Sequence, residues 1–488
     1  MTETTSDELD ERCAAAQSAS EVARRATTRE RASWLRAIAA ALDSNVDELV
    51  HIAAAETHLG LERLEGEVAR TSGQLRHLAS VIEEGSFLEL SIDHARDTVA
   101  PRVPDLRRML IPLGPVAVFS ASNFPFAFSV AGGDTASAIA AGCSVVVKAH
   151  SGHPQLSRRT TSVIDRALDE VGAPIGLVSL VEGTGAGAAL VMHPVIRAVG
   201  FTGSLAGGRA LFDRAMSRPD PIPFFGELGS INPVVITPGA DSARGAQLAE
   251  GLAQSFQLGA GQFCTKPGVV LVPRDSNVER HVGAHVRSAN ETLLTDRISA
   301  GFVEGVTAWQ RSTGVELIAG EMTHEPGSVR SMVFAVDAER LTTDSDALLA
   351  EVFGPTTLLV RYRDVNDVPR LLEDFEGSLT GTIHAEPDED VSSITDLFVG
   401  RAGRIVFNGW PTGVAVTWSQ HHGGPWPATT SQFTSVGATG IRRFLRPITF
   451  QDAPEAQLPP ELWESNPLGL PRRIDGELSI PDRRSRSS

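Results

Sequence analysis

Cysteine is scarce in this 488-residue sequence, and its scarcity excludes two kinds of architecture. The chain has only three cysteines, Cys13, Cys143 and Cys264, and they lie far apart. Such widely spaced cysteines are poor material for a disulfide framework or a cysteine metal site. We therefore expect a protein of a reducing compartment, the cytoplasm.

A targeting segment, long apolar runs and an excess of positive charge are also lacking. The first residues, MTETTSDELDER, are acidic, without the basic start and apolar stretch of a secretory signal. No run is long and apolar enough to span a bilayer. The formal net charge is −17, and a field of that sign repels nucleic acids and anionic membranes. We expect neither as a partner.

The sequence does contain enough apolar material for two or three domains. Of its residues, 42% are hydrophobic and 21% are charged, as in globular proteins. Residues 14–78 carry apolar side chains at spacings of three and four, which predicts amphipathic helices. Residues 86–112 are short β-like pieces broken by Pro101 and Pro104, and we interpret them as an extended arm.

Strand-like and helix-like segments alternate from Gly114 onward, and again from Asn232. This alternation predicts an α/β protein with two parallel sheets, each covered by helices. The last residues, PLGLPRRIDGELSIPDRRSRSS, offer little apolar surface and are predicted to form a tail.

Two glycine-rich segments compete as a phosphate-binding turn. GTGAGA, from Gly183, matches a loose dinucleotide pattern, but the acidic residue expected about 20 residues later is missing, so a plain strand-to-helix turn is favoured. FTGSLAGG places Gly203 and Ser204 before a helix, where backbone N–H groups can face a phosphate. A simple turn remains the alternative for this segment too.

Two further residues attract attention as chemical groups. Glu227 stands between glycines in FFGELGSINPVVI, and its apolar flanks make a raised pKa and a general-base role conceivable, although such carboxylates are usually solvated or paired. Cys264 follows a glycine-rich turn in QLGAGQFCTKPG. A lone cysteine is more often a small buried apolar residue than a nucleophile. The glycines would nevertheless let backbone N–H groups line an oxyanion site beside its sulfur.

Seven segments occur together in an order and spacing that resemble the aldehyde dehydrogenase superfamily. They are SNFPFAFS, VVVKAH, GFTGS, GELGSINPVVI, GQFCTKPG, EVFGP and FNGWPTG. The residues of KAHSGHP and HHGGPWPATTSQFTSVG most resemble the α-ketoglutaric semialdehyde (2,5-dioxovalerate) dehydrogenase subgroup, which has a fatty-aldehyde-oxidising relative. The resemblance implies an aldehyde dehydrogenase-like fold of two α/β domains and a small β oligomerisation arm.

The resemblance also assigns chemical roles. Cys264 becomes the nucleophile, Glu227 the general base, and Asn123 the side-chain oxyanion donor. A thiolate then attacks the aldehyde, hydride passes to a nicotinamide, and water hydrolyses the resulting thioester. The substrate implied is a semialdehyde, with fatty or aromatic aldehydes as the alternative. We cannot single out an arginine for a substrate carboxylate, and Trp410, Trp418 and Trp426 make the loop region bulkier than an acidic substrate needs.

For the cofactor, the resemblance implies five contacts. Lys148 would bind the adenosine ribose, Gly203 and Ser204 the pyrophosphate, and Glu351 and Phe353 the nicotinamide riboside.

One departure concerns the choice between NAD and NADP. Many NAD-preferring members carry a glutamate three positions after the lysine, where this chain has Ser151. A neutral hydroxyl there, with His150 close by, can accept a 2′-phosphate as a hydrogen-bond and charge partner, which favours NADP while leaving NAD possible. His150 and His153 without a third ligand do not indicate a metal.

The resemblance finally divides the chain and leaves two rivals. An acylating enzyme would not need Glu227, and a catalytically silent member would not need Cys264, Asn123 and Lys148 together. We expect a homodimer or homotetramer. The predicted parts are a cofactor-binding domain (1–96 and 115–229), a catalytic domain (230–437), the arm (97–114 and 438–455) and a C-terminal extension (456–488).

Overall fold

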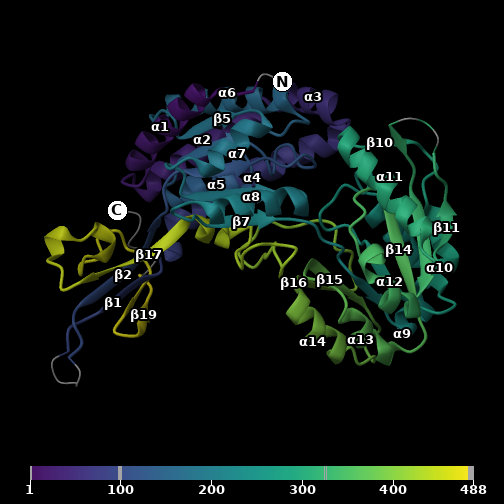
Figure 1. Ribbon diagram of the computed structural model, residues 1–488. Helices are drawn as coiled ribbons and strands as arrows, with labels where there is room; N and C mark the ends of the chain where they lie inside the picture. Colours follow the sequence, from purple (N-terminus) through teal and green to yellow (C-terminus); the bar gives the residue numbers. More distant parts are fainter. Residues whose placement is uncertain (1–2, 97–101, 324, 326, 482–488) are drawn as a thin grey trace.

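Two helix-covered sheets and a separate arm make up the structure (Figure 1). This computed structural model describes residues 3–96, 102–323, 325 and 327–481. The predicted α/β class is confirmed. Within the described residues, no helix is both long and apolar enough to cross a membrane.

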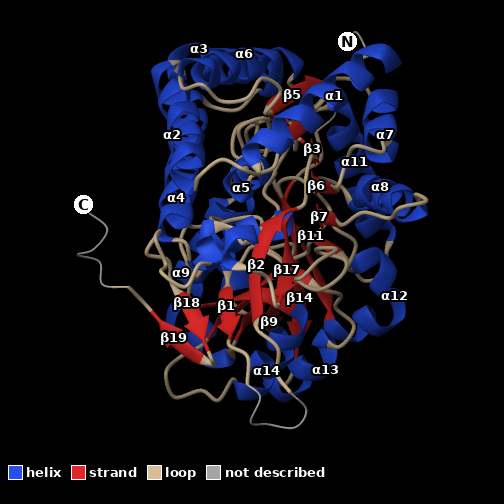
Figure 2. Cartoon of the chain, turned by 90° about the vertical axis from the view of Figure 1, so that its left-hand side faces the viewer, coloured by secondary structure: helices blue, strands red, loops and turns tan. Residues whose placement is uncertain are grey.

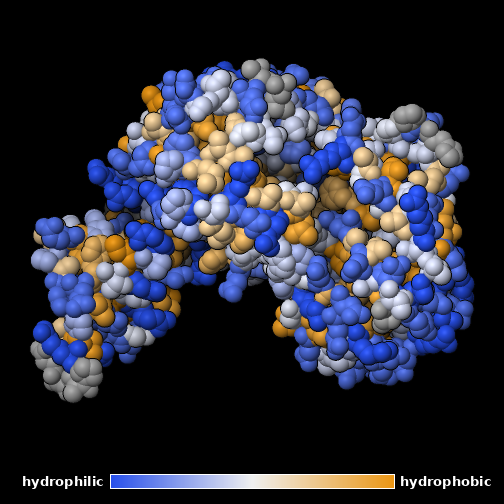
Figure 3. Space-filling view, in the orientation of Figure 1, coloured by the Kyte–Doolittle hydropathy of each residue, from blue (hydrophilic) through white to orange (hydrophobic). Residues whose placement is uncertain are grey.

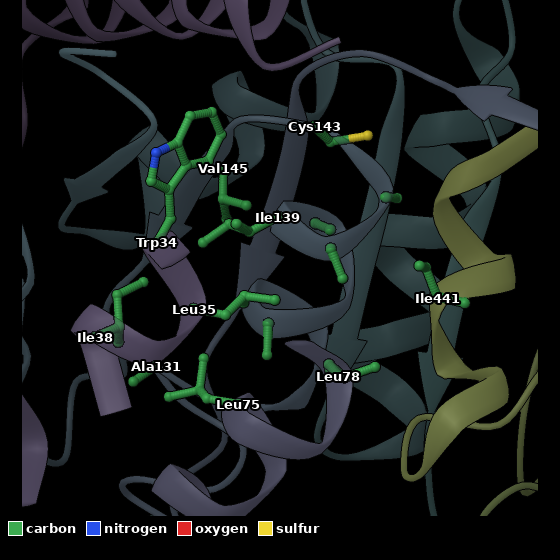
Figure 4. Packing of buried hydrophobic residues seen from close by; sticks show 14 of the residues in the cluster. Trp34, Leu35, Ile38, Leu75, Leu78, Ala131, Ile139, Cys143, Val145 and Ile441 are labelled. Carbon is green, nitrogen blue, oxygen red and sulfur yellow. The ribbon is translucent and has the colours of Figure 1, made fainter. Parts of the chain in front are cut away.

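The N-terminal helices form as the apolar spacing predicted. They are α1 (Ser6–Ala23), α2 (Thr28–Ser44), α3 (Val46–Thr57) and α4 (Leu61–Glu84). Thr5 and Thr27 close capping boxes at the starts of α1 and α2. Figure 4 shows the apolar faces of α2 and α4, with Leu35 and Leu75, packing against Ile139 of α5 (Gly133–Ala141).

The first sheet has five parallel strands in the order β5-β4-β3-β6-β7. Its strands are β3 (Val116–Phe119), β4 (Val145–Lys148), β5 (Val178–Val181), β6 (Ala198–Thr202) and β7 (Phe224–Glu227), linked by α5, α6 (Pro154–Glu170), α7 (Thr184–Met192) and α8 (Leu205–Ser217). Parallel strands all end at one edge of their sheet, which is where ligands bind in such folds. Asn123, Lys148, Ser204 and Glu227 therefore share an edge.

The second sheet has seven strands in the order β11-β13-β14-β9-β8-β15-β16, and only its edge strand β11 runs antiparallel. The strands are β8 (Val234–Ile236), β9 (Val269–Pro273), β11 (Glu316–Gly320), β13 (Met332–Asp337), β14 (Thr356–Tyr362), β15 (Ser378–His384) and β16 (Ala402–Phe407). The helices around it are α9 (Pro238–Phe256), α10 (Asn277–Val282), α11 (Asp296–Arg311), α12 (Leu341–Leu348), α13 (Val368–Leu372) and α14 (Ser392–Arg401). A short pair, β10 (Glu291–Thr292) and β12 (Ser328–Val329), lies beside them.

The arm is a five-stranded sheet of order β17-β2-β1-β18-β19 (Figure 2). It contains β1 (Leu90–Asp93), β2 (Leu106–Pro112), β17 (Leu445–Gln451), β18 (Arg472–Ile474) and β19 (Glu477–Ser479). The two predicted arm segments do meet, because β2 and β17 pair antiparallel over seven residues. Residues 97–101 of the predicted arm lie outside the described residues, and the domain boundaries themselves stay a prediction.

The predicted C-terminal tail is wrong for residues 467–481. Strand β18 pairs with β1, and Asp475 and Gly476, both at positive φ, turn the chain into β19. Leu462 and Leu470 are buried, and the Arg472 guanidinium donates hydrogen bonds to the carbonyl oxygens of Trp463 and Glu464, both at 2.7 Å. A few well-placed apolar residues and a turn thus outweigh a polar composition. Residues 482–488 of the predicted tail lie outside the described residues.

Substituting Leu462 tests how much this extension contributes. Its side chain is 0% exposed, so Leu462→Ala should lower the free energy of unfolding by about 3 kcal/mol, the cost of lost burial plus a cavity. Leu478, in β19, is 62% exposed, and Leu478→Ala is the matched control with almost no expected effect. Thermal denaturation of both variants checks this, and equal melting temperatures would contradict it.

Candidate active site

Cys264 lies on a tight loop between α9 and β9. The surface is hollowed between the two α/β bodies (Figure 3). Gly259, Ala260 and Gly261 all have positive φ, so the chain turns sharply just before the cysteine. A Cβ atom on Gly261 would collide with the carbonyl oxygen of Gly354, which explains the glycine. The Cys264 side chain remains partly exposed, while Cys13 and Cys143 are buried.

Asn232 fixes the Cys264 loop to the second sheet. Its side-chain amide donates to the carbonyl oxygens of Cys264 (2.7 Å) and Lys266 (2.9 Å). Its own amide oxygen accepts hydrogen bonds from the backbone N–H of Thr380 (3.2 Å) and from the Thr380 hydroxyl (3.1 Å). The sulfur therefore has a rigid support.

The sulfur of Cys264 begins a row of buried charged groups. It lies 3.6 Å from Nε2 of His422, and this nitrogen lies 3.3 Å from Oε2 of Glu227. The other carboxylate oxygen of Glu227 is 3.3 Å from the guanidinium of Arg443, which also binds Asp134 at 3.0 Å. The row thus consists of a thiol, an imidazole, a carboxylate, a guanidinium and a second carboxylate, each in direct contact with the next.

The charges in this row shift the pKa values of its members. Burial raises the pKa of Glu227, but the attraction of His422 and Arg443 outweighs it and lowers the value to about 2. Burial lowers the pKa of His422, yet the charges of Glu227 and Cys264 raise it overall to about 10. Glu227 and His422 therefore form a buried ion pair at neutral pH. The expectation of a raised pKa for Glu227 is wrong, because two cations surround it.

Asn123 lies close to the cysteine, as its predicted role requires. It follows β3, and its side-chain amide donates a hydrogen bond of 3.0 Å to the carbonyl oxygen of Gln262, two residues before Cys264. The Asn123 carbonyl oxygen accepts a 2.6 Å hydrogen bond from Arg63. The amide is therefore held next to the Cys264 loop with a second N–H left for an oxyanion.

The first turn of α8 fits a phosphate group. Ser204 caps the helix by accepting from the N–H of Gly207, and the exposed N–H groups of Leu205 and Ala206 have no partner among the residues that the structure describes. Gly203, before the cap, is exposed as well. Lys148 ends β4, two strands away, where burial lowers the pKa of its ammonium group. Open N–H donors and a cation at one sheet edge suit a dinucleotide.

Ser151 and His150 differ in what they offer a 2′-phosphate. Ser151 is exposed in the turn after β4. Burial and the neighbours His153 and Lys148 lower the pKa of His150 to about 3, so its ring is neutral and accepts a 3.0 Å hydrogen bond from Gly152. The expectation of a charged partner at His150 is therefore wrong. Among the described residues, no cluster of three or more His, Cys, Asp or Glu is arranged to hold a metal ion.

Glu351 and Phe353 lie in the segment that touches the Cys264 turn through Gly354. The carboxylate of Glu351 lies close to Gly229, two residues after Glu227. A Cβ atom on Gly229 would collide with this carboxylate. Beneath it the buried ammonium of Lys266 donates to the carbonyl oxygens of Val352 (3.0 Å) and Thr356 (2.7 Å). Burial lowers the pKa of Lys266 to about 8 despite the charge of Glu351.

Sequence reasoning missed His422, Arg443 and Asn232. His422 stands in the HHGGPWP segment and Asn232 in GSINPVV, both quoted for the resemblance but given no role. Arg443, in the 3₁₀ helix Ala438–Phe444, is 1% exposed, and no sequence signal marks it. All three act through contacts with residues far away in the chain.

The three tryptophans do not form one loop cluster. Trp410 packs on His384, with ring centroids 4.6 Å apart, and against Gly251 of α9. Trp418 contacts His77 of α4, whereas Trp426 lies beside Arg209 of α8. They therefore give no argument about the substrate.

A cysteine beside a histidine–carboxylate pair, and a helix N-terminus whose N–H groups are open to a phosphate, fit an oxidoreductase that uses a nicotinamide cofactor. The chain belongs to the aldehyde dehydrogenase family, whose model matches residues 1–425. The expected enzyme class is confirmed, and the protein oxidises aldehydes. The predicted site residues, although now placed, remain proposals.

Two curated relatives resemble the chain over nearly its whole length. It is 44% identical to alpha-ketoglutaric semialdehyde dehydrogenase 2 of Azospirillum brasilense, covering 96% of this chain and 91% of that protein. It is 40% identical to alpha-ketoglutaric semialdehyde dehydrogenase of Acinetobacter baylyi, covering 98% and 93%. The subgroup resemblance is thereby confirmed.

Solved structures share the fold. A 1-pyrroline-5-carboxylate dehydrogenase from Thermus with bound NAD (20% identity, 92% of this chain, 86% of that one) and an NADP-dependent enzyme of E. coli (23%, 91% and 90%) both give a TM-score of 0.77. Bifunctional proline utilization A matches equally well (24% identity, TM-score 0.77, 92% of this chain), but the chain spans only 45% of its length.

Proposed function

We propose that the protein oxidises α-ketoglutaric semialdehyde (2,5-dioxovalerate) to the dicarboxylate through a thioester on Cys264. The curated relatives at 44% and 40% identity carry that activity in their names. The observation that carries the mechanism is the row of Cys264, His422 and Glu227, with contacts of 3.6 and 3.3 Å.

In the first half-reaction the Cys264 sulfur forms a bond to the aldehyde carbon. The attacking sulfur lies 3.6 Å from Nε2 of His422, and the second side-chain N–H of Asn123 would donate to the alkoxide that develops. A bound nicotinamide cofactor supplies the acceptor for the hydride that leaves this carbon. The C=O bond then reforms, and an acyl thioester remains on Cys264.

In the second half-reaction water adds to the thioester carbon and the C–S bond breaks. Glu227, as an ionised carboxylate, takes the water proton, and the protonated His422 stays beside it, with Nε2 3.3 Å from Oε2. The sulfur leaves as a thiolate beside the imidazolium. An ionised carboxylate in this position supports hydrolysis over transfer to coenzyme A.

We propose NADP as the preferred cofactor, with NAD as a second acceptor. The exposed, neutral Ser151 supports this choice, since a glutamate there would repel a 2′-phosphate. One group opposes it: the Glu3 carboxylate accepts a 3.1 Å hydrogen bond from Ala186 in the first turn of α7 and attracts Lys148. Ser151→Glu should lower the NADP to NAD ratio of kcat/KM by about tenfold, and an unchanged ratio would remove Ser151 from the argument.

A matrix of aldehydes and cofactors tests the proposed function. Formation of NAD(P)H is followed with α-ketoglutaric semialdehyde, succinic semialdehyde, medium-chain and aromatic aldehydes, each with NAD and NADP, and with and without coenzyme A. The highest kcat/KM is expected for α-ketoglutaric semialdehyde without coenzyme A. A preference for long apolar aldehydes would overturn the substrate, and no reduction with any aldehyde would leave only a silent member of the fold.

The titration of His422 gives a direct check on the ion pair. Its pKa is raised from the ordinary 6.5 to about 10, so the pair stabilises the folded state fully below pH 6.5 and is lost as pH rises through 10. Histidine-selective NMR should show His422 protonated at pH 8, while His150 stays neutral. In Glu227→Gln the His422 proton should be lost at much lower pH, because burial then dominates. A neutral His422 in the wild type at pH 7 would contradict the charged pair.

We also propose that the protein is a cytoplasmic homodimer or homotetramer assembled through the arm. Strand β17 forms one edge of the arm sheet, so its outer N–H and C=O groups offer a template for another strand. Light scattering after size-exclusion chromatography measures the mass, and a monomer would contradict the proposal.

A further inference from the structure

We propose that Arg70 binds the carboxylate of the substrate and thereby selects aldehydes that carry an acid group at their far end. This inference rests on the proposed function and names the group that sequence reasoning left unassigned. A protein of net charge −17 must hold an anionic substrate with a local cation.

A polar stripe on α4 faces the site. Arg63, Glu67, Arg70, Gln74 and His77 follow one another at spacings of four and three, which places them on one side of the helix. Glu67 and Gln74 are buried, and Arg63 and His77 contact, respectively, Asn123 and Trp418. A helix face turned inward normally carries apolar residues, so this stripe needs another explanation.

Arg70 continues the line that starts at the nucleophile. Its guanidinium lies over the ring of Phe128, 5.6 Å from the ring centre, and that ring is 6.1 Å from the ring of His422. His422 in turn lies 3.6 Å from the sulfur of Cys264. A short substrate with its aldehyde at the sulfur would therefore pass Phe128 and reach Arg70 with its other end.

Arg70 is the arginine near the site that remains available. It contacts the ring of Phe128 but has no hydrogen bond or ion pair with any residue that the structure describes, and its side chain is only partly buried. Arg63 is held through Nη2, which donates to the carbonyl oxygen of Asn123 (2.6 Å), and by the ring of Phe263 at 4.9 Å, although its buried Nη1 has no partner among the described residues. Arg404, which also feels the charge of Cys264, donates to the carbonyl oxygens of Gly413 and Pro411.

The surroundings of Arg70 favour a carboxylate. Burial lowers its pKa and the charges of Glu67, Cys264 and Glu227 raise it, but a guanidinium stays protonated in either case. Glu67 forms no ion pair with it in this structure: one Glu67 oxygen accepts the backbone N–H groups of Phe126 (2.8 Å) and Ala127 (2.9 Å), and the other has no partner among the described residues. Phe128 beneath the guanidinium holds its plane. Two parallel N–H donors are then free for a bidentate carboxylate.

Two substrates of equal chain length separate this role from a general effect on catalysis. α-Ketoglutaric semialdehyde and pentanal share five carbons, but only the first has a carboxylate. In Arg70→Met, kcat/KM for the semialdehyde should fall about 100-fold, mainly through KM, with kcat/KM for pentanal changed by no more than about threefold. Arg70→Lys should give an intermediate loss, since an ammonium keeps the charge without the two-pronged contact.

Arg76→Met is the matched control. Arg76 lies on the same helix and carries the same charge, but it is exposed and pairs with Asp43. It should keep the wild-type preference. Equal losses for both substrates in Arg70→Met, or no loss for either, would overturn the role of Arg70 while leaving the proposed function in place. Pentanal activity reports that the variant is folded.

The wild type alone tests the proposed function. If the wild type oxidises pentanal with the same kcat/KM as the semialdehyde, the proposed substrate is wrong before any variant is made. The proposed role of Arg70 is then wrong too. Product inhibition gives a second readout: 2-oxoglutarate should inhibit the wild type and Arg76→Met, and inhibit Arg70→Met about 100-fold more weakly.

Discussion

Replacement of Cys264 by alanine is expected to lower the rate of NAD(P)H formation by about 10⁴-fold or more, with any aldehyde. Neither half-reaction is possible without the sulfur, because the first forms the C–S bond and the second breaks it. Its neighbours in the row, His422 and Glu227, would remain charged and in place. The measurement is the steady-state rate together with a melting temperature close to that of the wild type.

The other two cysteines provide controls for this result. Cys13 and Cys143 are buried, and burial raises the pKa of each thiol to about 11, so neither is a ready nucleophile. Cys13→Ala should retain nearly full activity. Brief alkylation of the wild type should modify Cys264 first and abolish activity in proportion. Turnover by Cys264→Ala would show that the sulfur is not the nucleophile.

Glu227→Gln should separate the two half-reactions. The amide cannot take the water proton, so steady-state turnover should fall about 10³-fold, whereas attack by Cys264 and hydride transfer do not use this proton transfer and should be slowed far less. Rapid mixing should therefore show a burst of about one NAD(P)H per site followed by a very slow phase. Mass spectrometry should find the acyl group on the peptide that contains Cys264.

The same variant should be less stable. Glu227 keeps His422 protonated and shares Arg443 with Asp134, so removing its charge breaks the buried pair with His422 and leaves Arg443 to Asp134 alone, which costs about 3 kcal/mol in comparable sites. Asp134→Asn is a useful comparison, because it removes one ion-pair partner of Arg443 and leaves Glu227 unchanged. A Glu227→Gln enzyme that gives neither burst nor turnover would place the residue in the first half-reaction.

Local pattern was sufficient to predict most of the scaffold. The alternation of strand and helix from Gly114 follows from short-range periodicity, and parallel strands then bring Asn123, Lys148, Ser204 and Glu227 to one edge. The glycines before Cys264 were interpreted correctly as a sharp turn, since positive φ is a local property. These parts depend on neighbours within a few residues.

What sequence reasoning missed depends on contacts between distant segments. His422 meets Cys264 across 158 positions, and Arg443 meets Glu227 across 216. Without them, the apolar flanks of Glu227 indicated a raised pKa, the opposite of what its two cations cause. The C-terminal strands β18 and β19 could have been predicted locally. The Asp475–Gly476 pair is a strong hairpin signal, but the polar composition of the segment favoured a tail. The polar stripe on α4 was likewise visible in the spacing of its residues.

The buried guanidinium of Arg443 also decides where this chain can be shortened. A fragment ending at residue 425 would keep Cys264, Glu227 and His422, and would therefore contain the proposed reactive groups. It would leave Asp134 and Glu227, both buried, facing one another without the cation that joins them. The smallest piece able to work is thus set by charge balance, and it must extend into the 3₁₀ helix that leads to β17.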